Sequence, residues 1–505
     1  MSDAASDPIA PSSRLGSIRR LQALYLLLGF SAGLPFFMFS TVLAVRLTDH
    51  GVALAVIGFF AWVQLLPTFK FLWAPLLDRY HVPGFARFWG KRRGWIMLSQ
   101  LGIVASLIAM AAMSSDASLP LTALLAVSLA FWTTTLEVAA DAWRIELAPT
   151  RELQAPLAAA NLWGYRTAMV AAGSGALLLA DRSGWTAAYL LIAAAAAVPL
   201  PILAALPAEQ PRDGGRAAAL GAGVGASTVI LAAVTALFAL VGSALLSGAD
   251  GLGIDSKANV TPWVLGVAML PFLAMAAALP RIRRASSQSR LRTSVAIGPY
   301  VDFFWRYGGL AIALMAFVSI YRMGDVLALN LSKPMILGLG YTKSEIGWAD
   351  GAVALIASIV GVGLGSWMAA RWRFATTLSI GALFAGIGNF GFVWLAHQPR
   401  DQGLLYLATA ADQFGNGMAG AIFVVYLSLL VNPRHAGAQY AFLSGFAFLL
   451  PRLLSGAGGT VVERLDARGL PGFDLFFLAS GAISLAAMLF IPLVARARAR
   501  EDDAP

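Results

Sequence analysis

The stretch FWTTTLEVAADAWRIE, residues 131–146, places Glu137, Asp141 and Arg144 inside or at the end of an apolar segment. In a helix these residues stand at i, i+4 and i+7, so they share one face. A charged side chain at the centre of a bilayer costs about 3 kcal/mol or more, even on lenient scales. We therefore expect this face to look into the protein or into a water-filled cavity, and the rest of the chain to enclose it.

Composition places the chain in a membrane. Of its 505 residues 59% are hydrophobic and only 12% are charged. The apolar residues fall in blocks of about 20, the length that crosses a bilayer as a helix, so we expect an all-α polytopic membrane protein. The net charge of +10 comes from basic residues in the loops between these blocks. Membrane orientation explains such loops better than binding to nucleic acid does.

Several chemistries are excluded or disfavoured. The chain has no cysteine, which excludes disulfides, thiolate metal sites and cysteine nucleophiles. Its four histidines fall in separate predicted loops, so we expect no metal and no other cofactor. The G-x-G-x-x-G spacings at Gly386 and Gly415 lie within predicted membrane helices and follow no strand, so they indicate helix packing. No phosphate-binding loop of the G-x-x-x-x-G-K-[ST] type occurs, and we expect the protein not to be an enzyme.

The apolar blocks form two groups of six. The first group predicts an N-terminal bundle over residues 21–206, with spans at 21–45, 54–77, 95–113, 119–142, 157–180 and 187–206. The second predicts a C-terminal bundle over residues 307–495, with spans at 308–339, 347–372, 375–396, 404–431, 438–462 and 473–495. The span near residue 308 carries Pro334 and several polar residues, so we expect it to be broken or kinked.

Residues 207–306 are expected to link the bundles. They contain two more apolar blocks, 217–246 and 261–279, which have no ionisable residue and suit accessory helices facing lipid. A basic loop at 281–292 and an aromatic stretch at 299–306 are expected at the membrane surface. Arginine and lysine gather on one side of the spans, which places the tails 1–20 and 496–505 in the cytoplasm and gives about fourteen spans. The N-terminal tail shows no cleavage site, so we expect a cytoplasmic tail and not a signal peptide.

An internal repeat supports two related halves. Five residues recur at one constant offset: Leu162, Gly164, Ser174, Gly175 and Ala176 match Leu443, Gly445, Ser455, Gly456 and Ala457. The fifth and eleventh spans of the two bundles are then equivalents in parallel repeats related by an axis along the membrane normal.

The loop after the second span has a recognisable charge pattern. Asp78 and Arg79 are followed by Lys91, Arg92 and Arg93. This pattern resembles the loop signature of the major facilitator superfamily, in which the acid caps a neighbouring helix and the arginines pair across the two halves. The plainer alternative is a loop whose positive charge only sets orientation. The resemblance implies the superfamily fold, with two six-helix bundles and here two inserted transmembrane helices.

Further stretches resemble one family of transporters, the muropeptide permeases AmpG of Gram-negative inner membranes. In chain order they are LLLGFSAGLPFFM at 26–38, FKFLWAPLLDRY at 69–80, KRRGW at 91–95, DAW at 141–143, GYR at 164–166, LLADRSGW at 178–185, RMGDVLALNL at 322–331, NGMAGAIFVVYLSLLVN at 416–432 and GAQYAFLSG at 437–445. They extend over both six-span halves. Where relatives have Gln-Asp before the DAW motif, this chain has Leu136 and Glu137, which keeps the carboxylate and loses the amide.

The resemblance implies proton-driven import of N-acetylglucosaminyl-1,6-anhydro-N-acetylmuramic acid, with or without its stem peptide. Cells use such import to recycle peptidoglycan, and the cargo can raise inducible β-lactamase. The expected partners are this muropeptide, protons and membrane lipid. The expected location is the bacterial inner membrane, as a monomer.

Three carboxylates are candidates for proton coupling: Glu137, Asp141 and Asp325. Burial and neighbouring like charges favour the protonated form of such groups. The alternative is a permanent buried ion pair with no role in transport, and Arg166 is expected to pair with Glu137 or Asp141.

The substrate candidates are polar or aromatic residues within predicted spans: Lys70, Trp132, Asn161, Tyr165, Arg166, Arg322, Asp412, Gln413, Asn416, Tyr440 and Arg452. Arg166 and Arg452 could meet a carboxylate of the cargo. Asp412, Gln413 and Asn416 suit a hydroxyl-rich sugar, and Trp132 and Tyr165 could stack on sugar rings. For each aromatic residue, ordinary packing is the competing interpretation, and Lys70 could instead extend to the nearby loop.

Two other functions are open at this point. One is a related carrier of another bulky anion, such as an acyl-coenzyme A or a siderophore. The other is a membrane scaffold that transports nothing, which would not need carboxylates facing a cavity.

Overall fold

The structure is a computed structural model that describes residues 11–52, 61–82, 84–113, 119–207, 273–286, 288–455 and 458–494. Every regular element in these ranges is helical. The expected inserted spans at 217–246 and 261–279 lie outside the described residues, except for the last part of the second. The tail 496–505 and the first ten residues of the other tail also lie outside them.

The N-terminal half contains the elements of the first six expected spans. In chain order they are α1 (Pro11–Met38), α2 (Thr41–Asp49), η1 (Ala61–Leu72), α4 (Ala74–Arg79), α5 (Phe85–Trp89), α6 (Lys91–Ala112), α7 (Leu119–Leu147), α8 (Arg151–Val170), η2 (Ala171–Gly175), α9 (Ala176–Ala197) and α10 (Pro199–Ala205). The expected fifth and sixth spans meet inside α9 at Gly184, whose φ of 82° and ψ of 166° are open to glycine and strained for other residues. Gly184 therefore marks the turn between these two spans.

The C-terminal half begins with three short helices and continues with the remaining spans. Its elements are α13 (Leu279–Arg283), α14 (Arg290–Thr293), α15 (Gly298–Tyr307), α16 (Leu310–Gly338), α17 (Lys343–Trp348), η3 (Ala349–Val353), α18 (Ala354–Arg371), α19 (Phe374–Ala396), α20 (Gln402–Leu430), η4 (Pro433–His435), α21 (Ala436–Ser455), α22 (Gly458–Asp466), α23 (Gly472–Ala486), η5 (Ala487–Phe490) and α24 (Ile491–Val494).

Nine helical runs in the described residues are long and apolar enough to cross a membrane. They cover ten of the twelve expected spans of the two bundles, because the run Arg151–Ala205 holds two spans. The other two expected spans, 54–77 and 438–462, each include residues outside the described ranges. The chain is thus a multi-pass membrane protein, and the described part contains two groups of spans.

Two local predictions differ from the structure. Most of the described part of the second expected span is a 3₁₀ helix, η1, and only its last residues belong to the α-helix α4. Pro67 lies inside η1 and removes a backbone donor that an α-helix would use. The span with Pro334 was expected to be broken or kinked, and it is not broken: α16 runs from Leu310 to Gly338 with Pro334 inside it. This proline lies close to the C-terminal end of the helix, where few backbone hydrogen bonds remain to be lost.

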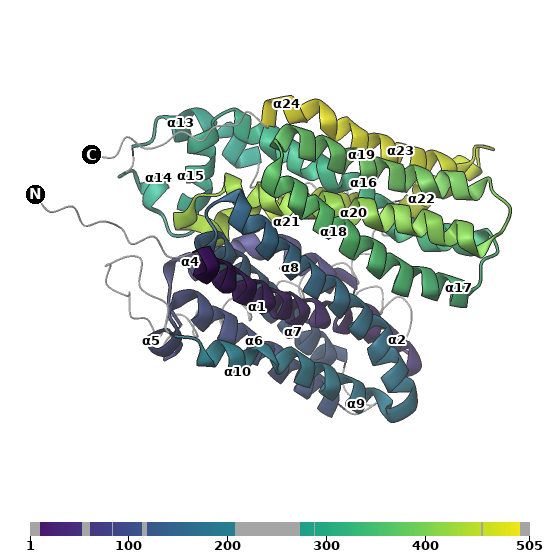
Figure 1. The fold of residues 1–505 in the computed structure, drawn as a ribbon, viewed down its shortest axis with the longest axis horizontal. Helices are drawn as coiled ribbons and strands as arrows, with labels where there is room; N and C mark the ends of the chain where they lie inside the picture. The colour runs from purple at the N-terminus through teal and green to yellow at the C-terminus, as the bar shows by residue number, and fades with distance from the viewer. Residues whose placement is uncertain are drawn as a thin grey trace, which may run out of the picture.

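The two halves pack with a twofold pattern. Within the halves α1 packs on α8, and α16 packs on α21; between the halves α8 packs on α18, and α21 packs on η1. In Figure 1 the N-terminal half (purple to blue-green) lies below the C-terminal half (green to yellow). Helices α4, α5 and α13–α15 lie at one end of the molecule, which we call the terminal end. At the other end α2 and α9 lie apart from α17.

Glycine decides how closely α1 and α8 approach. A Cβ added to Gly29 would lie 2.0 Å from the carbonyl oxygen of Asn161, and one added to Gly164 would lie 2.0 Å from that of Leu26. Neither distance is possible for a carbon atom, so the two helices cross backbone against backbone. This contact fixes the helix that carries Tyr165 and Arg166.

The aromatic stretch before the C-terminal bundle, expected at the membrane surface, packs into the protein. Most of α15 is buried, including Tyr300, Asp302 and Phe304. Asp302 accepts hydrogen bonds from the side chains of Asn432 (3.1 Å) and Gln439 (2.9 Å). The helix is buried because these bonds and its aromatic rings fix it against α21, so α15 is part of the C-terminal half.

Candidate functional site

Helix α7 carries the acidic face that the sequence singles out. Glu137 lies 3.6 Å from Lys70, measured between Oε2 and Nζ, and Lys70 is buried in η1. Glu137 itself keeps 22% of its side chain exposed. Lys70 therefore does not extend to the loop, and the pair occupies the inside of the N-terminal half.

One turn further along α7, Asp141 pairs with Arg144 at 2.9 Å. Arg144 is fully buried and also donates to Gln154 Oε1 (2.7 Å) and to Ser428 Oγ (3.0 Å). Ser428 belongs to α20, so this arginine joins the two halves. Its guanidinium also lies 5.6 Å from the ring centre of Tyr440. Tyr440 thus contacts a buried arginine from the C-terminal half.

A second group of polar side chains joins the halves through α8, α16 and α20. We call it the central polar cluster, and its members are Arg166, Arg322, Asp325, Asp412, Gln413 and Asn416. The amide oxygen of Asn416 accepts a hydrogen bond from Arg166 Nη2 (2.9 Å) and another from Arg322 Nη2 (3.2 Å). One neutral oxygen therefore holds two arginines, one from each half.

The two arginines differ in whether a carboxylate pairs with them. Arg322 Nη1 lies 2.7 Å from Asp325 Oδ2, and both side chains are buried in α16. Arg166 makes no ion pair within 4.0 Å of any described residue, and its other hydrogen bond is a long one of 3.4 Å to Gln413 Oε1. Asp412 and Asp325 act on it only at longer range. The expected pairing of Arg166 with Glu137 or Asp141 is wrong, because its guanidinium reaches across to α20 instead.

The remaining members of the cluster lie on α20. Gln413 donates from Nε2 to Asp412 Oδ2 at 2.8 Å, so its amide connects the carboxylate of Asp412 to Arg166. Asp412 also lies within electrostatic range of Asp325. The polar residues expected on this span thus contact one another and both halves.

Tyr165 lies between the two polar groups. It is partly exposed and within electrostatic range of Glu137, Arg166 and Arg452. Arg452 donates to the carbonyl oxygen of Gln64 (3.1 Å), another contact between the halves. These residues make one polar strip from the Lys70 pair to the central polar cluster.

Two substrate candidates lie elsewhere. The indole of Trp132 packs against Gly102 of α6, where an added Cβ would lie 2.3 Å from the ring. Trp132 and Glu137 are five positions apart, about 140° around the helix, so the ring faces a neighbouring helix. Asn161 is partly exposed one turn before Tyr165 on α8, and its backbone forms the contact with Gly29.

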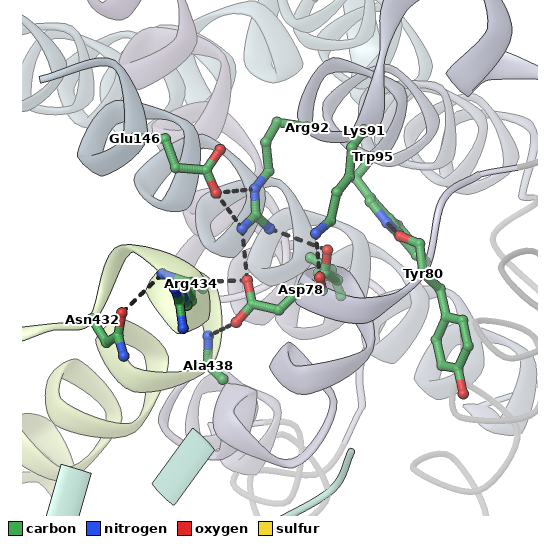
Figure 2. A network of polar contacts seen from close by, with 11 residues as sticks. Asp78, Tyr80, Lys91, Arg92, Trp95, Glu146, Asn432, Arg434 and Ala438 are labelled. Carbon is green, nitrogen blue, oxygen red and sulfur yellow. Dashed lines mark hydrogen bonds and ion pairs between the residues drawn. The ribbon is translucent and has the colours of Figure 1, made fainter. Parts of the chain in front are cut away.

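The loop motif forms a network at the terminal end (Figure 2). Asp78 accepts hydrogen bonds from the backbone nitrogens of Gly437 (3.1 Å) and Ala438 (2.7 Å), so it caps the first turn of α21. On its other side Asp78 pairs with Arg92 at 2.7 Å, and Arg92 also donates to Glu146 through Nε (2.9 Å). An acid of the N-terminal half therefore holds a helix of the C-terminal half.

The superfamily signature implies arginines that pair across the halves, and here the carboxylate of Asp78 makes a contact that crosses the interface. Arg92 binds acids of its own half, and Arg93 donates to the backbone carbonyls of Leu203 and Leu206 at the end of α10. Arg79 is exposed. The carboxylate crosses the interface here because the amides of the α21 N-terminus are the groups it faces.

Contacts between the halves gather toward the terminal end. Besides the Asp78 cap, Arg151 Nη1 donates to the carbonyl oxygen of Trp372 at 2.9 Å. Among the described residues, no hydrogen bond or ion pair joins the halves at the opposite end, where Figure 1 shows α2 and α17 apart. The structure is thus joined at the terminal end.

Four residues that bind the arginines or α21 in these networks were not among the candidates: Glu146, Gln154, Asp302 and Ser428. Each stands near a helix end or in a segment expected to be a loop, where composition gives no reason to select it. Glu146 was detectable as the acid two residues after Arg144 in the opening stretch, at the same end as the basic loop. Gln154 and Ser428 carry no sequence signal of their own.

This arrangement can bind a polar, charged molecule between the two halves. It offers cations and carboxylates within a membrane protein, and its partly exposed members include Glu137, Asp141, Arg166, Asp412, Gln413 and Asn416. Polar groups shared by two repeats near the middle of the spans are typical of secondary transporters. The site has the features of a transporter and not of a packing core.

The fold is that of the major facilitator superfamily. The human organic anion transporter MFSD10 matches with a TM-score of 0.57 at 15% identity, covering 95% of this chain and 100% of that one. The proton:xylose symporter XylE, bound to 6-bromo-6-deoxy-D-glucose, matches with a TM-score of 0.58 at 14% identity, covering 96% of each chain.

Sequence comparison adds the particular relatives. No protein-family model matches the chain. The anhydromuropeptide permease of Escherichia coli K12 is 29% identical over 472 residues, covering 92% of this chain and 79% of that one. A Rickettsia felis protein named as a transporter, AmpG 4, is 26% identical over 470 residues, covering 92% and 94%. The chain is a homologue of AmpG and the anhydromuropeptide permeases, which confirms the resemblance inferred from its motifs.

Proposed function

We propose that the chain is a proton-coupled transporter of N-acetylglucosaminyl-1,6-anhydro-N-acetylmuramic acid, with or without its stem peptide. It carries this cargo from periplasm to cytoplasm across the bacterial inner membrane, for peptidoglycan recycling. The observation that supports this proposal most is the contact of Arg166 and Arg322 with one oxygen of Asn416. It gives the two halves a shared polar site, as rocking of one half against the other requires. The names of the relatives supply the cargo.

The proposed proton carriers are Glu137, Asp141 and Asp325. Each is paired with a cation, at 3.6, 2.9 and 2.7 Å respectively. Protonation of a carboxylate removes the charge that holds its partner, so a bound proton changes the contacts of that cation. The pair of Glu137 with Lys70 is the longest of the three, and we assign the coupling proton to Glu137 first.

The proposed cargo residues are those of the central polar cluster together with Lys70, Tyr165, Tyr440 and Arg452. The sugar hydroxyls would bind to Asp412, Gln413 and Asn416. Trp132 is left out, because its ring packs against Gly102.

Uptake into proteoliposomes tests the proposal. The protein is reconstituted and offered radiolabelled N-acetylglucosaminyl-anhydro-N-acetylmuramyl tripeptide, with and without an inward proton gradient. We expect the wild type to accumulate the cargo only with the gradient. Glu137→Gln is expected to lose accumulation and to keep exchange of labelled for unlabelled cargo, because exchange needs no net proton movement.

A matched control is Glu152→Gln, which neutralises a carboxylate with 60% of its side chain exposed at the start of α8. It is expected to accumulate cargo like the wild type. Uptake by the wild type that is indifferent to the gradient and to an uncoupler would refute proton coupling. No uptake by a folded wild type would refute the cargo.

A further inference from the structure

The oxygen of Asn416 occupies a position that suits a negative charge. It accepts from two guanidinium groups, Arg166 Nη2 and Arg322 Nη2, although it carries no charge itself. Arginine and a carboxylate attract each other as opposite charges and can form two parallel hydrogen bonds, whereas a neutral oxygen offers arginine neither. A carboxylate in this place would therefore be held more tightly than the amide that is there.

The direct contacts of the two arginines point in the same direction. Asp325 compensates Arg322, whereas Arg166 contacts only the neutral amides of Gln413 and Asn416 among the described residues. Asp412 and Asp325 lie within electrostatic range of Arg166, but neither carboxylate is among its hydrogen-bond partners. A carboxylate in direct contact stabilises an arginine in a membrane protein better than a neutral amide does, and a bound molecule can supply that contact.

The donor geometry is that of a carboxylate site. Arg322 binds Asp325 through Nη1. The edge of its guanidinium that carries Nε and Nη2 donates to Asn416 through Nη2 alone. Its Nε is buried and has no hydrogen-bond partner among the described residues. An arginine edge with two parallel donors matches the two oxygens of a carboxylate, whereas an amide offers a single oxygen.

Resting on the proposed function, we propose that a carboxylate of the cargo displaces the Asn416 side chain and binds between Arg166 and Arg322. Because Arg166 lies on α8 and Arg322 on α16, the bound carboxylate joins the two halves at their centre. The lactyl carboxylate of the muramic acid fills this role in the peptide-free sugar, and a stem-peptide carboxylate does so in the peptide-bearing cargo. Asn416 holds the arginines together while the site is empty.

The test compares two ligands that differ in one charge. The first is N-acetylglucosaminyl-1,6-anhydro-N-acetylmuramic acid, which has a single carboxylate, and the second is its primary amide, which has nearly the same shape. Titration calorimetry on the full-length protein in lipid nanodiscs measures both affinities. We expect the wild type to bind the acid about 10- to 100-fold more tightly than the amide, the range for charge-assisted hydrogen bonds to a bound carboxylate.

Two variants locate this difference. Arg166→Gln is expected to bind acid and amide equally, at the wild-type affinity for the amide, which also shows that the variant is folded. Asn416→Asp keeps both arginines and places a tethered carboxylate between them, so it is expected to bind the acid no better than the amide. Arg151→Gln is the control: it removes another arginine that joins the halves, at the terminal end, and should keep the wild-type preference.

The outcomes separate the two proposals. Wild-type protein that binds neither ligand would refute the proposed cargo. Wild-type protein that binds both ligands equally would leave the cargo standing and refute the carboxylate site. If both Arg166→Gln and Asn416→Asp still prefer the acid, the carboxylate of the cargo binds elsewhere and the proposed carboxylate site is refuted.

Discussion

Replacing Asp78 by Asn is expected to release the terminal end of the molecule. The Asp78 carboxylate accepts two backbone hydrogen bonds from Gly437 and Ala438, which belong to the other half. Asparagine has the same shape but carries no charge, and its amide nitrogen cannot accept from a backbone N–H. At least one of the two bonds is therefore lost, together with the attraction of the carboxylate to the helix N-terminus.

The size of this effect depends on which contacts of Asp78 cross the interface between the halves. Hydrogen bonds to a charged group contribute about 1.5–3 kcal/mol each, so losing one charge-assisted bond across the halves costs about 2 kcal/mol. That energy corresponds to a shift of about 30-fold toward conformations in which the terminal end is open. The bond between Asp78 and Arg92 lies within the N-terminal half and is kept in both conformations, so it adds little to the shift.

Spin-label distance measurements can follow this shift. The chain has no cysteine, so cysteines introduced at Thr150 and Arg373 can be labelled without background. Both positions are exposed at the terminal end, one in each half, beside the contact of Arg151 with Trp372. In Asp78→Asn we expect a population at longer distance that is minor in the wild type. A second pair at His50 and Ser344, exposed at the opposite end, is expected to move closer.

Glu146→Gln is the matched control. It removes a carboxylate that binds the same arginine, Arg92, but from within one half. The distances at Thr150 and Arg373 should stay as in the wild type. If Glu146→Gln opens the terminal end as much as Asp78→Asn does, the reasoning from contacts across the halves is wrong.

Two further predictions concern stability. Gly164→Ala should lower the Tm in detergent by a few degrees, because the new Cβ would meet the Leu26 carbonyl and overpacking costs about 1–3 kcal/mol. Gly175→Ala is the control and should leave the Tm unchanged, because a Cβ there meets nothing within 4 Å. Equal Tm values for the two variants would contradict the argument. Burial lowers the pKa of His435 below 6.5, so its contribution to stability is present above pH 6.5 and is lost as the pH falls through the lower folded value. His435→Gln should therefore reduce the decline of Tm between about pH 7 and about pH 5, and an unchanged decline would refute this.

The sequence allowed much of the fold to be predicted. Apolar blocks of span length and the charge pattern of the loops depend on local composition, which a bilayer selects directly. The 3₁₀ form of η1 and the burial of α15 were missed because both depend on partners far along the chain. Tyr300, for example, donates to the backbone carbonyl of Phe71, and no local pattern predicts that contact.

The candidate site was predictable as a set of residues but not as a set of pairs. Ionisable and amide groups in apolar spans stand out, so Arg166, Arg322 and Asn416 could all be selected. Which groups bind each other depends on helix rotation and on packing between halves, for which a single sequence has no signal. Arg166 was therefore expected to bind an acid of α7, whereas it contacts two amides of α20.

The burial of α15 has a consequence for dividing the protein. Asp302 ties this helix to Asn432 and Gln439, so the chain from α13 onward behaves as a unit with the C-terminal half. A split version made of residues 1–207 and 273–505, expressed as two chains, keeps α15 on the same chain as α21, against which it packs. A split placed after Tyr307 would leave it on the wrong fragment. Co-expression of the first pair is expected to reassemble a functional complex, which allows each half to be labelled with isotopes separately.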